Sequence, residues 1–240
     1  MSHNFPSQHN QWPRSFGPAR GRPLRPRQRE LFAELLPKIE IHTPKSGKLD
    51  PTTCFSLPTS RVWMEIGFGA GEHIAFQAEK NPDVGFIGCD LYKPGTASLL
   101  TLIRERNLDN IRLFCDDARI LLSCIQRRTI EKVFILFPDP WPKTRHHKRR
   151  IISKKVLDEL SGILIQGGEL KIATDHPSYL IWILRHMQQN ASFDWKVKRP
   201  QDWKSELQGR PITRYEKKAL AAGRNCTYLK YILNTSRTGC

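Results

Sequence analysis

Short apolar runs recur along the chain from Arg61 onward, and they predict buried β-strands. The first four runs are Val62–Ile66, Val84–Cys89, Ile111–Cys115 and Val133–Phe137. Continuous apolar runs of this length are typical of strands that are covered on both faces. Helical segments separate the runs, the first from about residue 72 to residue 80. This alternation predicts an α/β fold with a doubly wound, mostly parallel sheet.

The second half of the chain continues the alternation. Apolar residues share one helical face over Lys154–Gln166, and Gly167-Gly168 is expected to end that helix. A fifth strand is predicted over Glu169–Thr174. Two closing strands are predicted over Phe193–Val197 and Cys226–Leu233.

A glycine-rich loop, Gly67-Phe68-Gly69-Ala70-Gly71, follows the first strand. Glycines at such a place allow a sharp turn from strand to helix and let a ligand approach the main chain closely. Glu72 stands where a dinucleotide fingerprint has its third glycine, and Glu65 puts a carboxylate just before the loop. Both acids disfavour a pyrophosphate ligand and favour a cationic one.

Acidic residues also follow the next two strands. Asp90 comes about twenty residues after the glycine loop, where ribose hydroxyls are held in this architecture. Asp117 could accept a hydrogen bond from an adenine amino group. Each acid alone is better explained as a helix N-cap. Glu65, Asp90 and Asp117 at three successive strand ends instead favour an adenosyl ligand with a positive charge, S-adenosylmethionine.

The fourth strand ends in a proline-framed turn, Phe137-Pro138-Asp139-Pro140-Trp141-Pro142-Lys143. The prolines restrict the backbone and hold the Asp139 carboxylate forward. The stretch Lys143–Lys155 contains seven Lys/Arg, two His and no acid. Taken separately, such a turn is usually structural and such a basic run is usually a solvated face. Together, beside a strand's carboxyl end, they favour chemistry on a nucleic acid.

The overall composition agrees with a polyanionic partner. The 240 residues include 39 Lys/Arg against 23 Asp/Glu, a formal net charge of +16. The six cysteines form no C-x-x-C pair and the eight histidines are scattered, so neither zinc nor a disulfide framework is expected and a reducing cytoplasm is the expected location. No segment has the apolar length of a membrane span.

The amino-terminal residues differ in composition from the rest. Residues 1–27 are rich in Pro, Gly, Asn, Gln and Arg, and are predicted to be disordered because they cannot bury enough apolar surface. This basic arm is either a solubilising tail or a segment that orders against RNA phosphates. A short helix is expected over Arg27–Leu36, ending near Pro37, and a polar connector over 42–60. Residues 28–240 are expected to form a single domain.

Four pieces of the sequence together resemble the bacterial tRNA (guanine-N7-)-methyltransferase family. They are Glu65-Ile66-Gly67-Phe68-Gly69, Phe137–Trp141 with Lys143 and the run Arg145–Arg150, Ala173-Thr174-Asp175, and Thr213-Arg214-Tyr215-Glu216. The resemblance implies a Rossmann-like class I methyltransferase with a seven-stranded sheet whose last strand is antiparallel. It also implies methyl transfer from S-adenosylmethionine to guanine N7 at position 46 of the tRNA variable loop.

The resemblance also assigns expected roles to individual residues. Asp139 is the expected catalytic residue. Cofactor contacts are expected from Glu65, Gly67, Gly69, Asp90, Asp117 and Asp139, and substrate contacts from Lys143, Asp175, Thr213, Arg214, Tyr215 and Glu216. Arg145, Lys148, Arg149 and Arg150 are expected to contact the RNA backbone. Asp90 departs from the Glu that relatives often have, but its shorter side chain still reaches a ribose diol.

The chemistry of the acceptor limits what Asp139 has to do. Guanine N7 carries a lone pair and no proton, so its methylation needs no general base. Asp139 is therefore expected to orient the guanine or to face the cation that forms on methylation. Trp141 either packs under the turn or stacks on a base, and Lys143 either contacts a phosphate or guanine O6 or is simply solvated. Glu216 could accept from guanine N1–H and the amino group, a pairing that adenine cannot reproduce.

Two other functions are compatible with parts of the sequence. A non-catalytic RNA-binding protein on the same fold would explain the charge, although the acids at four strand ends disfavour it. A methyltransferase for protein or small-molecule acceptors would explain the fold, but not the acid-free basic run. The sequence leaves the oligomeric state and the preferred tRNA species open.

Overall fold

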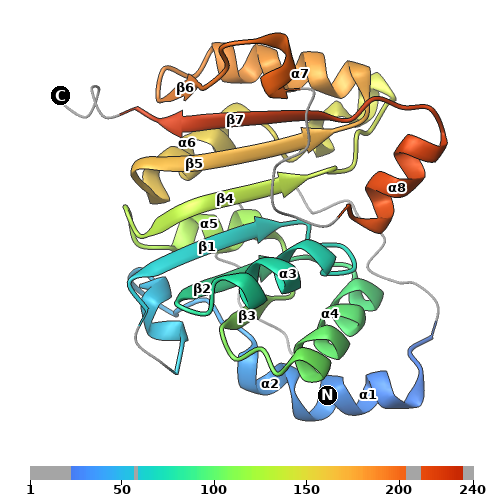
Figure 1. Cartoon of the computed structure of the whole chain (residues 1–240). Coiled ribbons are helices and arrows are strands. Elements are labelled where there is room, and N and C mark those ends of the chain that lie inside the picture. The colour runs from blue at the N-terminus through green and yellow to red at the C-terminus, as the bar shows by residue number, and fades with distance from the viewer. Residues whose placement is uncertain (1–22, 57–58, 204–211, 235–240) are drawn as a thin grey trace.

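A computed structural model describes residues 23–56, 59–203 and 212–234, so most of the expected basic arm lies outside the described residues. Its centre is a seven-stranded sheet in the order β3-β2-β1-β4-β5-β7-β6 (Figure 1). The strands are β1 (Arg61–Ile66), β2 (Val84–Cys89), β3 (Ile111–Phe114), β4 (Ile130–Leu136), β5 (Leu164–Thr174), β6 (Phe193–Trp195) and β7 (Thr227–Leu233).

Strand directions confirm the expected fold class. The pairs among β1, β2, β3, β4 and β5 are parallel, whereas β7 runs antiparallel to both β5 and β6. The first five strands therefore all end at the same edge of the sheet, their carboxyl edge. Because β7 is reversed, it begins at that edge, where Thr227 pairs with Thr174. The segment that precedes β7 is thus brought to the same edge.

Helices cover both faces of the sheet. They are α1 (Pro26–Glu34), α2 (Leu36–Ile39), α3 (Glu72–Lys80), α4 (Lys93–Arg106), α5 (Ala118–Cys124), α6 (Lys154–Ile163), α7 (Pro177–Gln188) and α8 (Arg214–Ala221). Short 3-10 turns are η1 (Pro51–Cys54), η2 (Thr144–Arg149) and η3 (Pro200–Trp203). Residues of α5, α6 and α7 share one apolar cluster with the sheet, and those of α1 to α4 and α8 share the other.

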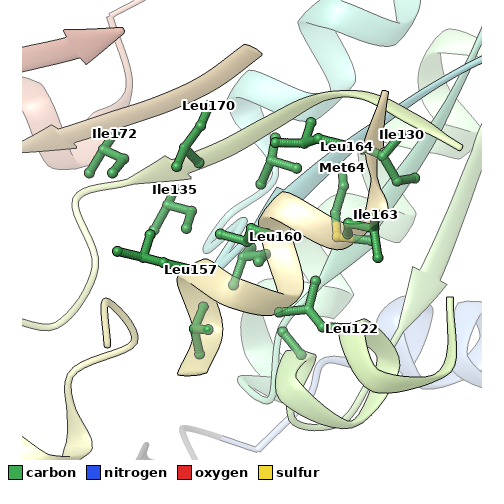
Figure 2. Packing of buried hydrophobic residues seen from close by; sticks show 14 of the residues in the cluster. Met64, Leu122, Ile130, Ile135, Leu157, Leu160, Ile163, Leu164, Leu170 and Ile172 are labelled. Atoms are coloured by element: carbon green, nitrogen blue, oxygen red, sulfur yellow. The ribbon is translucent and has the colours of Figure 1, made fainter. Parts of the chain in front are cut away.

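The amphipathic pattern of α6 explains its place in the fold. Its apolar side chains Leu157, Leu160 and Ile163 are buried and point toward the strand residues around them, as Figure 2 shows. Ser153 caps the helix by accepting a hydrogen bond from the Val156 N–H group. Removing side chains of this size from such a core typically costs about 2–5 kcal/mol each.

The predicted end of α6 was wrong by several residues. The helix stops at Ile163, and β5 already begins at Leu164, which pairs with Ile130 of β4. Gly167, with φ of +74°, lies in an irregular stretch of β5, where the register with β4 shifts, and does not cap the helix. Local periodicity continued the helix because the first apolar residue of β5 falls on the same helical face. Pairing with β4 overrides that pattern.

The end of the amino-terminal helix also differs from the prediction. The expected helix over Arg27–Leu36 is α1, which ends at Glu34, and a second helix, α2, begins at Leu36. Pro37 lies in the first turn of α2, where a missing N–H is tolerated. The described part of the expected connector over 42–60 contains η1, and Leu49 forms a bridge to Ile125.

Candidate methyl-transfer site

The predicted site residues that the structure describes follow strands β1, β2, β3, β4 and β5 or lie at the start of α8. All of these positions lie at or near the carboxyl edge of the sheet (Figure 1). The chain moves outward from β1 in one direction through β2 and β3, and in the other through β4 and β5. Ligands of open α/β sheets bind where the strand order reverses in this way. The topology therefore places a binding site above β1 and β4.

The glycine loop has the geometry that the sequence suggested. Gly67, Gly69 and Gly71 all have positive φ angles, of +78°, +55° and +80°. Side chains rarely adopt this conformation, so glycines are required for the turn. Open space lies where a Cβ atom would stand on Gly67 and Gly69, whereas on Gly71 it would lie 2.6 Å from Leu99 Cβ. The loop thus leaves its main chain accessible at Gly67 and Gly69 and packs tightly at Gly71.

Asp90 holds this loop in place. Its Oδ2 atom accepts a hydrogen bond from the Gly69 N–H group at 2.8 Å, and its Oδ1 atom accepts one from Tyr92 N–H at 2.9 Å. Burial nevertheless raises the pKa of Asp90 above its usual range, with a smaller contribution from Asp139. A carboxylate oxygen can accept more than one hydrogen bond, so Asp90 can still bind a ribose hydroxyl.

Gly95 of α4 packs directly against the glycine loop, a contact that was not apparent from the sequence. A Cβ atom at this position would lie 2.1 Å from the Gly69 carbonyl oxygen. Only glycine therefore allows α4 to pack this closely against the glycine loop. The lone glycine near the start of a helical stretch was the available signal, because glycine there often marks close packing.

Glu65 is buried and paired with a histidine. Its Oε2 atom lies 2.7 Å from His73 Nδ1 in α3, and both side chains are almost fully buried. His73 also packs edge-on against Phe134 at 4.8 Å between ring centroids. The histidine therefore fixes the orientation of the Glu65 carboxylate just before the glycine loop. Sequence reasoning identified Glu65 but not its partner.

Asp117 is the N-cap of helix α5. It accepts a hydrogen bond from the Arg119 N–H group at the start of α5, and its carboxylate also pairs with the Arg119 guanidinium. Both side chains are buried. The N-cap explanation considered for Asp117 is thus part of the structure. An adenine amino group would have to share this carboxylate with Arg119.

The Asp139 turn has an unusual backbone conformation. Phe137 and Trp141, which flank it, both have positive φ angles, of +51° and +41°, and neither is glycine. Such conformations are uncommon for large side chains and gather at functional sites. Phe137 N–H donates to Ala173 O at 2.8 Å, which fixes the start of the turn to β5. The Asp139 side chain reaches the surface, and partial burial raises its pKa.

Arg150 was expected to contact RNA phosphates, and the structure contradicts this. Its side chain is buried, only 3% of the residue being exposed. Its guanidinium donates to the Pro140 carbonyl at 2.8 Å and lies 5.0 Å from the ring centroids of Tyr179 and Trp182. Arg150 therefore holds the Asp139 turn against α7 from inside the protein. A run of basic residues gives no indication of which one turns inward.

The remaining cations of the run do face solvent. Lys143, Arg145 and Lys148 are exposed, the last two within η2. Arg149 is half-buried, with its guanidinium 4.8 Å from the Trp141 ring centroid. Trp141 thus packs against the basic run rather than filling the core. The surface beside the Asp139 turn is strongly positive.

The segment Thr213–Glu216, from which substrate contacts were expected, forms the N-cap and first turn of α8. Thr213 is the N-cap and forms a capping box with Glu216. Glu216 is fully buried and also accepts a hydrogen bond from the Tyr228 hydroxyl. Its expected contact with guanine would require this carboxylate to leave its present partners. The spacing of Thr213 and Glu216 in the sequence is itself the capping-box pattern.

Two further contacts bring α8 close to the Asp139 turn. The exposed Tyr215 ring lies 6.0 Å from the ring of Phe137. Arg224, just after α8, pairs with Asp175 at 2.7 Å. Burial raises the pKa of Tyr215, with further contributions from the nearby charges of Asp175 and Asp139. The structure therefore brings Asp90, Asp139, Asp175 and Tyr215 together at one edge of the sheet.

Within the described residues, no cluster of three or more His, Cys, Asp and Glu side chains is arranged to hold a metal ion. No helix in the same part of the chain has the length and apolar character needed to cross a bilayer.

The fold is that of Rossmann-like methyltransferases, and a family model places the chain among methyltransferases. A solved structure described as an antibiotic-related methyltransferase superposes with a TM-score of 0.53 at 17% identity, covering 74% of this chain and 89% of that one. Residues 59–229 match the family model described as "Putative methyltransferase".

Curated relatives identify the family more narrowly. A tRNA (guanine-N(7)-)-methyltransferase of Rhodospirillum rubrum is 40% identical over 90% of this chain and 86% of its own length. The enzyme of the same name from Paramagnetospirillum magneticum is 41% identical over 91% and 92%. The chain belongs to the tRNA (guanine-N7-)-methyltransferase family, as the four motifs had indicated.

Proposed function

We propose that the protein transfers the methyl group of S-adenosylmethionine to N7 of a guanine in the variable loop of tRNA. The observation that carries this proposal is the position of the Asp139 turn. In the strand order β2-β1-β4-β5 the turn follows β4, between Asp90 after β2 and Asp175 after β5, and it adjoins Tyr215 and an exposed basic surface. Membership of the family supports the choice of guanine and tRNA.

The residues at the carboxyl edge suit an adenosyl sulfonium cofactor. Asp90 and Asp139 are partly desolvated and have raised pKa values, so a cationic ligand would stabilise their charged forms. Gly67 and Gly69 leave open space over the main chain where the methionine part would lie. We assign Glu65, Gly67, Gly69, Asp90, Asp117 and Asp139 to this ligand, with Arg119 sharing the Asp117 carboxylate. When bound, the cofactor supplies an electrophilic methyl group.

In the mechanism we propose, the protein aligns the two reactants. Guanine N7 attacks with its own lone pair, so no residue has to remove a proton. The Asp139 carboxylate either accepts a hydrogen bond from guanine N1–H or the amino group, or stabilises the positive charge that develops on the base. The proline-framed backbone of the turn keeps that carboxylate in place. Alignment of this kind can lower a barrier by about 7–11 kcal/mol in favourable cases.

The substrate side would hold the nucleoside and its phosphates. Lys143 follows the turn and Asp175 follows β5. The start of α8, Thr213–Glu216, adjoins the turn through the contact of Tyr215 with Phe137. Tyr215 is exposed and close to Phe137, so its ring is available to the base. Glu216 is buried under α8, so we assign it the support of this segment, and direct base recognition only if α8 rearranges. Arg145 and Lys148 would contact the RNA backbone.

Product analysis tests this function directly. The protein is incubated with methyl-labelled S-adenosylmethionine and bulk tRNA, the RNA is digested, and the labelled nucleoside is identified. We expect 7-methylguanosine, and fragment mapping should place it in the variable loop. Label in 1-methylguanosine, or in added protein with none in RNA, would refute the proposal. The Asp139→Asn variant is the control, because it should leave the RNA unlabelled.

A further inference from the structure

Glu72 joins two parts of the site that are 142 residues apart in the chain. It is the first residue of α3, directly after Gly71 of the glycine loop. Its Oε2 atom accepts a hydrogen bond of 2.6 Å from the backbone N–H of Arg214, the first residue of α8. Its Oε1 atom lies 3.6 Å from the Arg214 Nε atom.

This contact completes the first turn of α8. The first N–H groups of a helix have no partner within the helix. Thr213 and Glu216 satisfy two groups of the α8 start through the capping box. The Arg214 N–H group is satisfied from outside α8, by Glu72 at the start of α3, directly after the glycine loop. A negative charge at this end of a helix is also favourable.

The backbone hydrogen bond is the stronger part of the contact. Solvent reaches 74% of the Arg214 side chain and 31% of that of Glu72, so water screens the ion pair between them. The hydrogen bond to the backbone needs only an acceptor oxygen at the right place. A glutamine at position 72 should therefore retain most of the effect, whereas alanine should lose it.

We propose that Glu72 is a positioning residue that couples cofactor binding to nucleoside binding. A cofactor on the glycine loop would further restrain the loop and Glu72 directly after it, and Glu72 holds the start of α8, Thr213–Glu216, at the substrate side. Coupling of this kind is reciprocal, so tRNA must raise the affinity for cofactor by the same factor. The inference rests on the proposed function, since it assumes that these two sides bind cofactor and nucleoside.

The test compares tRNA affinity with and without S-adenosylhomocysteine, which binds without reacting. For the wild-type protein, the ratio of the two dissociation constants should exceed one. In Glu72→Ala this ratio should fall to about one, and KM for tRNA should rise by about 5- to 20-fold, as expected for a partly exposed hydrogen bond to a charged group. The affinity for S-adenosylhomocysteine alone should change less than about twofold, because Glu72 is directed at α8. Glu72→Gln should restore most of the wild-type ratio.

Glu79→Ala is the matched control, because Glu79 lies on the same helix and pairs with Arg106 at 2.9 Å, away from α8. It should leave the ratio unchanged. A wild-type ratio of one, a normal ratio in Glu72→Ala, or the same loss in Glu79→Ala would overturn the inference. These outcomes differ from failure of the proposed function, which is judged by whether wild-type protein forms 7-methylguanosine in tRNA.

Discussion

Arg150 offers the sharpest test of how the site is built, because sequence and structure assign it different partners. If Arg150 holds the Asp139 turn from inside, its planar guanidinium is essential and its charge alone is insufficient. Arg150→Lys keeps the charge but loses the fork of donors and the stacking between rings. We therefore expect Arg150→Lys to lose both stability and turnover.

The magnitude follows from the contacts. The hydrogen bond to Pro140 O at 2.8 Å involves a charged donor and contributes about 1.5–3 kcal/mol. The bonds to Trp141 O and Ser178 Oγ are longer, at 3.5 and 3.4 Å, and contribute less. Stacking on Tyr179 and Trp182 adds about 0.5–2 kcal/mol. Replacement by lysine should thus lower the free energy of unfolding by about 2–4 kcal/mol.

Two measurements distinguish a cation that holds the Asp139 turn inside the protein from one that contacts RNA phosphates at the surface. Urea denaturation gives the free energy of unfolding, and the slope of log K for tRNA against log salt counts the phosphate contacts. Arg150→Lys should be destabilised while its salt slope stays at the wild-type value. Lys148→Gln removes an exposed ammonium group with three hydrogen-bond donors. It should behave in the opposite way, with a salt slope flatter by about 0.7–0.9 and unchanged stability.

The reasoning about Arg150 would be refuted by a lysine variant with wild-type stability and turnover. It would also be refuted if Arg150→Met flattened the salt slope by a full contact while the protein remained folded. Either result would mean that the guanidinium reaches solvent and RNA in the working enzyme.

Three further predictions follow from the site. Asp90→Ala should weaken cofactor binding by about 1.5–3 kcal/mol, the contribution of a hydrogen bond to a charged group, as measured by calorimetry. Asp139→Ala should abolish turnover in a single-turnover assay, with a smaller change in cofactor affinity. The pKa values of Asp90 and Asp139 are raised, so cofactor affinity should be full above these pKa values and fall as the pH drops through them. The fall should begin above the ordinary carboxyl pKa of about 3.9, and an affinity that does not change with pH in that range would contradict this. Gly95→Ala should displace Gly69 and weaken cofactor binding, and unchanged affinity by calorimetry would show that the loop adapts without loss.

Much of the fold could be predicted because the signals are local. The apolar runs give β1 and β2 within a residue, and the predicted helix after the glycine loop matches α3. Glycine permits backbone conformations that other residues rarely adopt, and proline restricts the backbone, so the glycine loop and the Asp139 turn were apparent without tertiary information. The antiparallel direction of the last strand is different, because that prediction came from resemblance to a family rather than from the pattern itself.

The missed features all depend on tertiary packing. Nothing near Arg150 in the sequence shows that Tyr179 and Trp182 will surround it. Gly95 is important only because α4 crosses the Gly69 carbonyl. Glu72 was noted as the residue that breaks a dinucleotide pattern, yet its partner lies 142 residues away. In each case the residue type was visible, and its partner was not.

These contacts have a common consequence for the reaction that we propose. An acceptor that needs no proton removed places the whole requirement on alignment, so the positions of backbone segments matter more than the acidity of any side chain. Asp90 fixes the glycine loop, Arg150 fixes the Asp139 turn, and Glu72 links the loop to α8. Because a buried group holds the Asp139 turn, substitutions that remove its contacts should lower stability and turnover together. Substitutions on the exposed basic surface should lower only the affinity for RNA.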